Sequence, residues 1–203
     1  MNGKEYIKAL KNAYEKKGLG NEWQHLEQIS HGISDEDKRR LLEEYPDFPP
    51  SLMEILETID GTYYRKYGDE KICFYFFGSD VEEGKYPYYL FSAEDILKNR
   101  NSRSDLDDYF DCDDDEYAEE FGPYVDERLR KNGENIKWLR FSDCMNNGGS
   151  SALFIDFTPS EKGVKGQVVR FLHDPDEIWV IADSFDEFLD MQEKNSFRFI
   201  HND

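Results

Sequence analysis

The chain has 203 residues, enough for one domain with a sizeable core, and 34% of them are charged. Aspartate and glutamate number 45 against 25 lysines and arginines, so the formal net charge is -20. A surface of this sign repels nucleic acid and anionic lipid and attracts basic partners. Because 15% of the residues are aromatic, we expect a folded chain and not a disordered one.

The three cysteines, Cys73, Cys112 and Cys144, lie far apart and form no Cys-x-x-Cys pair. This spacing supports neither a zinc site nor a redox motif, so we expect reduced thiols, no metal and no cofactor. Residues 1–17 lack the apolar core of a signal peptide, and no apolar stretch approaches the roughly 20 residues that a membrane helix needs. We therefore expect a cytoplasmic protein.

The first third of the chain has the pattern of a helical region. Apolar residues at helical spacing, together with capping residues, predict helices over residues 6–14, 23–29, 34–45 and 51–60. Ser51 and Glu54 have the spacing of a cap at the start of the fourth helix. We expect residues 1–30 to form a helical extension to a domain that spans residues 31–203.

The remainder of the chain predicts a sheet. Short runs rich in β-branched and aromatic residues indicate strands over residues 72–77, 88–91, 138–141, 152–157, 167–172 and 178–182. Residues 146–150 have the composition of a loop between two of them. Residues 173–177 form a connection short enough to require antiparallel pairing. Ser92 and Ser184 are the expected N-caps of two further helices.

Residues 105–120 form an acidic insertion with ten acidic residues and no basic one, which is half of the formal net charge. A solvated acidic loop is the simpler interpretation. The alternative is mimicry of a phosphate backbone toward a basic nuclease surface. The candidate partner-binding residues are Asp107, Asp108, Asp111, Asp113, Asp114, Asp115 and Glu116. A calcium loop is not expected, because Glu116 stands at a position of the EF-hand pattern that requires glycine.

Two other patterns allow a chemical and a structural interpretation. His173 and Asp174 could form an acid–base pair, but with Pro175 they are typical of a turn, and no nucleophile motif accompanies them. Three aromatic residues on expected strands could line a cleft, although a place in the core is the commoner role: Trp138, Phe171 and Trp179. We therefore expect residues 173–175 to form a turn and the three aromatic residues to lie in the core.

Several short segments of the C-terminal third resemble those of one family: Trp138-Leu-Arg-Phe-Ser-Asp143, residues 154–161, residues 166–169, His173-Asp174 and residues 182–189. Together they resemble the SMI1/KNR4 (SUKH) family. The upstream segment from Pro49-Pro50-Ser51-Leu52 to Asp60-Gly61 is similar to the same family. The resemblance spans residues 33–192, and it implies an α+β fold with a mostly antiparallel sheet flanked by helices.

The resemblance also implies a function. Members of this family are typically immunity proteins of bacterial toxin systems, many of them against nucleases, and a eukaryotic branch regulates cell-wall synthesis and signalling. None is generally regarded as an enzyme. We therefore expect a non-catalytic immunity protein that occludes a basic toxin domain with an acidic surface. A regulatory scaffold and an enzyme with an unrecognised site are the alternatives. Residues 143–150 depart from the Asp-Gly-x-Gly-Asn-type loop of the family.

Overall fold

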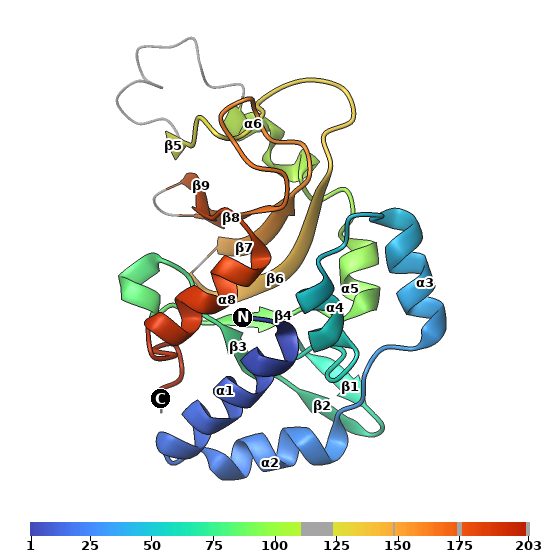
Figure 1. Ribbon diagram of the computed structural model, residues 1–203, viewed down its shortest axis with the longest axis vertical. Coiled ribbons are helices and arrows are strands. Elements are labelled where there is room, and N and C mark those ends of the chain that lie inside the picture. Colours follow the sequence, from blue (N-terminus) through green and yellow to red (C-terminus); the bar gives the residue numbers. More distant parts are fainter. Residues whose placement is uncertain (111–123, 148, 174–175, 202–203) are drawn as a thin grey trace.

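The computed structural model describes residues 1–110, 124–147, 149–173 and 176–201 and confirms the α+β fold (Figure 1). In these residues seven strands form one sheet in the order β3-β4-β6-β7-β8-β9-β5, and only the pair of β5 and β9 is parallel. Strands β1 and β2 form a separate hairpin. The strands are Arg65–Tyr67 (β1), Glu70–Ile72 (β2), Tyr75–Phe77 (β3), Tyr88–Leu90 (β4), Tyr124–Val125 (β5), Trp138–Asn147 (β6), Gly149–Asp156 (β7), Gln167–Leu172 (β8) and Glu177–Ala182 (β9).

The expected helices are present, with caps that explain where several of them begin. Ser34, Ser92 and Ser184 each accept a hydrogen bond from the backbone N–H three residues later, as expected for N-caps. None of the described helices combines the length and the apolar composition needed to cross a bilayer. The helices are Gly3–Lys16 (α1), Gly20–Ile29 (α2), Asp35–Glu44 (α3), Pro50–Leu56 (α4), Ala93–Lys98 (α5), Asp107–Phe110 (α6) and Phe185–Lys194 (α8), with short 3-10 turns at Val81–Gly84 (η1) and Ser104–Leu106 (η2).

The start of α4 differs from the prediction. The cap position is Pro49, the first helical residue is Pro50, and Ser51 lies buried inside the first turn and caps nothing. Proline suits the first helical position because its φ is already helical and the missing N–H would have no helical partner there. The predicted cap at Ser51 was therefore wrong, although the predicted helix is confirmed.

The predicted strand over residues 72–77 was wrong as one element. Strand β2 ends at Ile72 and β3 begins at Tyr75, and the two belong to different sheets. Between them Cys73 is exposed, and the N–H of Phe74 donates to the carbonyl of Thr62. A continuous apolar run does not reveal such a change of partner, because periodicity carries no information on pairing.

The predicted loop over residues 146–150 was also wrong. Strands β6 and β7 continue their antiparallel pairing to the pair of Asn147 and Gly149. Residues 146, 147, 149 and 150 therefore belong to strands, and Gly148 between them lies outside the described residues. The short connection between β8 and β9 does impose antiparallel pairing, as predicted.

The main hydrophobic core lies on one face of the large sheet, which we call the first face. It receives side chains from β6, β7 and β8, including Leu139, Phe141 and Leu153, and is covered by α1, α4, α5 and α8. The aromatic side chains of Phe77, Phe141 and α8 residue Phe188 meet here with ring centroids 5.5–5.7 Å apart. Burial of such large rings supplies most of the drive to fold.

Helix α1 also protects the edge of the sheet. The hydroxyl groups of Tyr6 and Tyr14 donate to the carbonyl oxygens of Phe76 (2.5 Å) and Tyr75 (2.7 Å) on the edge strand β3. An uncovered edge strand would offer these carbonyls to another chain. The boundary placed at residue 30 stays a prediction, and expression of residues 31–203 alone would test it.

We expect Tyr6→Phe to lower the free energy of unfolding by about 1–2 kcal/mol, because the buried Phe76 carbonyl loses the hydroxyl donor while the ring stays in place. Urea denaturation measures the change. The matched control is Tyr64→Phe, whose side chain is 42% exposed and whose hydroxyl group water can solvate. Equal stability of the two variants would contradict the proposed role of the Tyr6 hydroxyl.

Candidate partner-binding surface

On the opposite side of the large sheet, which we call the second face, the described helices η2 and α6 cover the β7–β9 end, and residues of α1 and α2 lie at the β3 end. Side chains directly opposite each other on neighbouring strands share a face. The register places one row of residues across this face, in the order Tyr75, Tyr89, Asp143, Ala152, Phe171 and Ile178. Turn η2, helix α6 and Leu129 pack on the β7–β9 end of the face in a second hydrophobic cluster. Figure 1 shows α6 and β5 at the end of the molecule far from α1 and α2.

An ion pair lies near the middle of the second face. Arg140 Nη2 lies 2.6 Å from Asp143 Oδ2, and the two side chains are only 14% and 13% exposed. The Arg140 guanidinium group lies over the rings of Phe91 (5.3 Å) and Phe154 (5.9 Å). Burial raises the pKa of the Asp143 carboxyl group, and the positive charge of Arg140 opposes that rise. A partly buried ion pair is costly to desolvate, so its position here favours a role in recognition.

A β-bulge explains why these two residues meet. In a regular strand, residues three apart point to opposite faces. The register of β6 against β7 shifts between Arg140 and Ser142, so that Arg140 faces Phe154 and Asp143 faces Ala152, both on the second face. Sequence reasoning missed the pair because simple alternation separates its members.

A cleft of about 260 Å³, which we call the sheet pocket, opens between α6 and the strands. Its floor consists of Ala152, Phe154 and Phe171, and Asp105, Tyr109 and Arg140 stand around it. Burial, and then the carboxylates of Asp176 and Asp108, raise the pKa of the Tyr109 hydroxyl group. The pocket thus combines an aromatic floor with charged groups at its border, a combination typical of protein interfaces.

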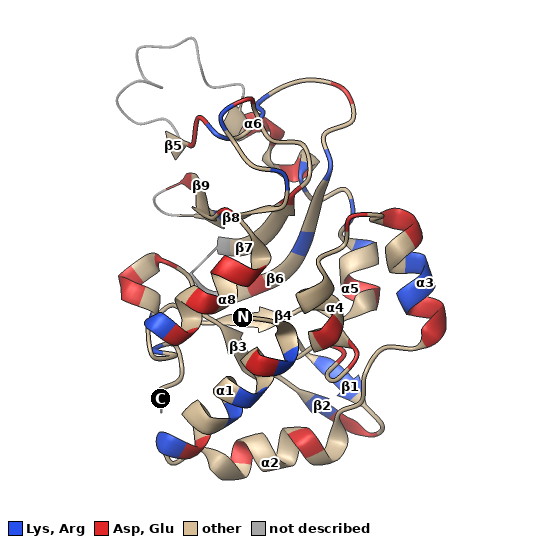
Figure 2. Cartoon of the chain, viewed as in Figure 1, with Lys and Arg blue, Asp and Glu red and all other residues tan. Residues whose placement is uncertain are grey.

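The structure places part of the predicted acidic site beside this pocket. Asp107 and Asp108 are exposed on α6, and Asp105 precedes them at the pocket; we call these three residues the acidic rim. The other predicted site residues, Asp111, Asp113, Asp114, Asp115 and Glu116, lie outside the described residues. Figure 2 shows further acidic residues along α3, α8 and η1, so charge alone does not single out one surface.

Arg103 fixes the acidic rim to the body of the protein. Its side chain is 6% exposed, pairs with Asp107 and donates to the Lys131 carbonyl at 3.0 Å. Its guanidinium group lies 3.7 Å from the ring centroid of Phe110 and 5.2 Å from that of Trp138. These contacts hold the backbone of α6 in one position. A partner that binds the rim carboxylates therefore does not have to order this helix first, which lowers the entropic cost of binding.

The remaining predicted residues have structural explanations. His173 Nδ1 lies 2.7 Å from Asp176 Oδ1, a contact within the short connection between β8 and β9; Asp174 and Pro175 lie outside the described residues. Trp138 and Phe171 are buried, as predicted, and Phe171 also lines the sheet pocket. The expected core position of Trp179 was wrong, because its side chain is only partly buried and packs against the exposed Tyr124, with ring centroids 4.6 Å apart. Cys73 and Cys144 form no disulfide. The described part of the chain contains no cluster of three or more potential metal ligands.

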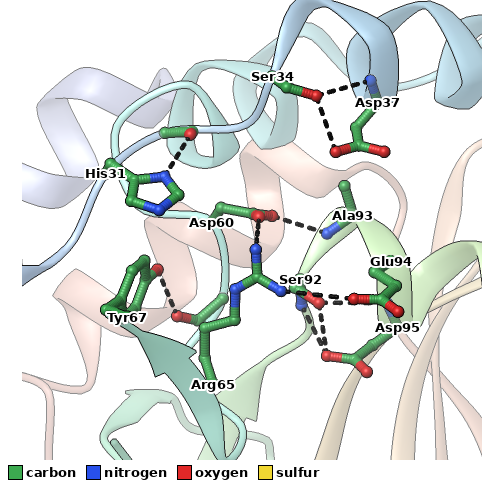
Figure 3. A network of polar contacts seen from close by, with 12 residues as sticks. His31, Ser34, Asp37, Asp60, Arg65, Tyr67, Ser92, Ala93, Glu94 and Asp95 are labelled. Carbon is green, nitrogen blue, oxygen red and sulfur yellow. Dashed lines mark hydrogen bonds and ion pairs between the residues drawn. The ribbon is translucent and has the colours of Figure 1, made fainter. Parts of the chain in front are cut away.

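Asp60, the aspartate of the Asp60-Gly61 segment, occupies the centre of a polar network (Figure 3). Its buried carboxylate accepts hydrogen bonds from the Ala93 N–H (2.8 Å) and from Arg65 Nη2 (2.5 Å). Burial raises the pKa of this carboxyl group, and both donors oppose the rise. The network joins the segment after α4 to β1 and to the start of α5. Because its donors come from within the fold, we assign Asp60 a structural role.

We expect Gly61→Ala to lower the free energy of unfolding by about 2–3 kcal/mol. Gly61 has φ +92°, and a Cβ atom there would lie 2.6 Å from the backbone nitrogen of Ser92. The matched control is Gly18→Ala, with φ +79° but no atom within 4 Å of the new Cβ. Thermal melts of both variants separate the two contributions, and a larger loss for Gly18→Ala would contradict the close-approach argument.

The comparison with known families agrees with this architecture. The family model described as "SMI1 / KNR4 family (SUKH-1)" matches residues 32–191, most of the chain. The chain belongs to the SMI1/KNR4 (SUKH-1) family. No curated protein matches the sequence. The SUKH-1 match includes all of β1 to β9 and begins after α2, so the two N-terminal helices lie outside it although they share the main core.

Proposed function

We propose that this SUKH-1 protein is a non-catalytic immunity protein. It binds a basic toxin domain in the cytoplasm and covers its active site, and nuclease domains are the first class to test. Family membership supports the general role. The observation that carries the specific proposal is the fixed position of the acidic rim beside the sheet pocket, held there by the contacts of Arg103.

The two parts of this surface have different tasks. The rim carboxylates attract a basic domain over a distance and speed its encounter, an effect that salt screens. The sheet pocket, with Phe154, Phe171 and Tyr109, offers buried area to a few anchoring side chains of the partner, which slows dissociation. A basic nuclease surface, evolved to bind phosphates, complements such a rim.

The test is co-expression with toxin domains encoded beside the gene, followed by binding measurements on the purified complex at about 0.05 M and about 0.5 M salt. We expect rescue of growth, a one-to-one complex and an association rate that falls with salt. Failure to rescue from every neighbouring toxin would reject the proposal, and capture of several unrelated proteins would favour a scaffold function. Turnover of a substrate that depends on His173 would show that the protein is an enzyme.

A further inference from the structure

A second hollow, which we call the tyrosine pocket, lies at the β3 end of the row across the second face. It has a volume of about 570 Å³ and is lined by Tyr14, Glu22, Cys73, Tyr75, Tyr89 and His201, among others. It is thus built from α1, α2, the two first strands of the large sheet and the C-terminal segment. Tyr75 and Tyr89 belong to the same row as Asp143, so this pocket and the sheet pocket share one face of the sheet.

The walls of the tyrosine pocket are aromatic. The ring centroids of Tyr75 and Tyr89 lie 5.2 Å apart, those of Tyr89 and Tyr63 5.8 Å, and those of Tyr75 and His201 5.9 Å. The faces of such rings carry partial negative charge and attract cations. The neighbouring Tyr64 ring already holds one, because Lys71 Nζ lies 4.7 Å from its centroid.

The charge at the pocket is negative. Glu22 is exposed at its border, and burial followed by the Glu22 carboxylate raises the pKa of the Tyr14 hydroxyl group. Among the described residues that line the pocket there is neither lysine nor arginine. No lysine or arginine of the described lining therefore neutralises the Glu22 carboxylate. A pocket with aromatic faces beside such a carboxylate attracts an arginine or lysine side chain more strongly than an apolar or an acidic one.

We propose that the tyrosine pocket receives a cationic side chain, arginine or lysine, from a protein partner. Arginine fits best, because its flat guanidinium group stacks on an aromatic ring and donates to a carboxylate at the same time. For the identity of the partner this proposal rests on the proposed function. The pocket itself can be tested without any toxin, so the two proposals fail separately.

The labelling rate of Cys73 can report whether the pocket is occupied, because Cys73 lines the pocket and is exposed, whereas Cys144 is buried. In a Cys112→Ser background, the Cys73 thiolate attacks neutral methyl methanethiosulfonate, forms a mixed disulfide and releases methanesulfinate. The probe is a Gly-Arg-Gly amide peptide, and Gly-Gln-Gly amide is its neutral counterpart. We expect the arginine peptide at saturation to slow labelling of Cys73 by about threefold or more, and the glutamine peptide to leave it unchanged.

Two variants and one control locate the effect. Glu22→Gln removes the border carboxylate, and Tyr75→Leu removes an aromatic wall without changing the charge. Each should raise the concentration of arginine peptide that gives half-maximal protection by about threefold or more. Asp69→Asn removes one exposed carboxylate outside the pocket and should leave protection intact. Glu22 is exposed, so its variant remains informative if Tyr75→Leu does not fold. No protection by arginine, equal protection by glutamine, or equal protection in Glu22→Gln and its parent would overturn the proposal.

Discussion

Arg140→Met is expected to lower the free energy of unfolding by about 3–5 kcal/mol. Methionine keeps much of the volume of the side chain between Phe91 and Phe154 but leaves the Asp143 carboxylate buried without its partner, which is the costly way to break an ion pair. Urea denaturation at neutral pH measures the loss. The matched control, Arg39→Met, breaks an ion pair with Glu43 that is 62% exposed on both sides, and it should change stability little.

The variant should also acquire a characteristic pH dependence. Burial already raises the pKa of Asp143, and removal of Arg140 takes away the charge that opposes this rise. The folded state then binds the proton more tightly than the unfolded chain does. The contribution of this carboxyl group to stability is therefore largest below the unfolded pKa of about 4 and is lost as the pH rises through the raised folded value. A pH profile parallel to that of the unmodified protein would contradict this explanation.

A double variant separates stability from recognition. Arg140→Met with Asp143→Leu removes both charges, and we expect most of the lost stability to return because no uncompensated charge remains. If the pair also serves recognition, the affinity for the partner stays about tenfold or more weaker than that of the unmodified protein. Recovery of affinity together with stability would show that the pair is purely structural.

Neutralising the acidic rim by Asp105→Asn and Asp108→Asn together, with Asp107 left in its pair with Arg103, is expected to slow association with the proposed basic partner about tenfold or more at low salt. The dissociation rate should change less, because exposed carboxylates act mainly during encounter. Stopped-flow measurements at increasing salt test this, and the difference from the unmodified protein should shrink as salt screens the rim.

The control for the rim removes the same formal charge elsewhere. Asp186→Asn and Glu161→Gln change two exposed residues outside α6 and both pockets. If this double variant slows association as much as the rim variant does, net charge alone explains the steering, and the rim has no special place in the interface.

Much of the fold could be predicted because several helices and strands are each marked by more than one local sequence signal. Helix α8 has both the cap at Ser184 and an inward stripe that includes Phe185 and Phe188, and either signal predicts it. The break at Cys73 could not be predicted, because the residues on both sides favour a strand and only tertiary pairing decides which sheet each one joins.

The candidate site could be predicted only in part. Asp107 and Asp108 stand out in the sequence as members of a charge run, and they do lie beside a pocket. The Arg140–Asp143 pair depends on a bulge, which shifts the alternation of side chains by one residue and leaves no clear mark in composition. Tyr75 and Tyr89 become neighbours through strand register, and one residue of slippage would place them on opposite faces.

The two tyrosine hydroxyls that α1 sets against β3 also restrict how another protein can approach. Many adaptor domains capture an extended peptide as an extra strand, through main-chain hydrogen bonds that depend little on the sequence of the guest. At β3 this mode would compete with α1, since Tyr6 and Tyr14 already donate to two carbonyls of that edge strand. Selection of a guest at this end of the molecule is therefore left to side chains, which makes discrimination between related partner proteins possible.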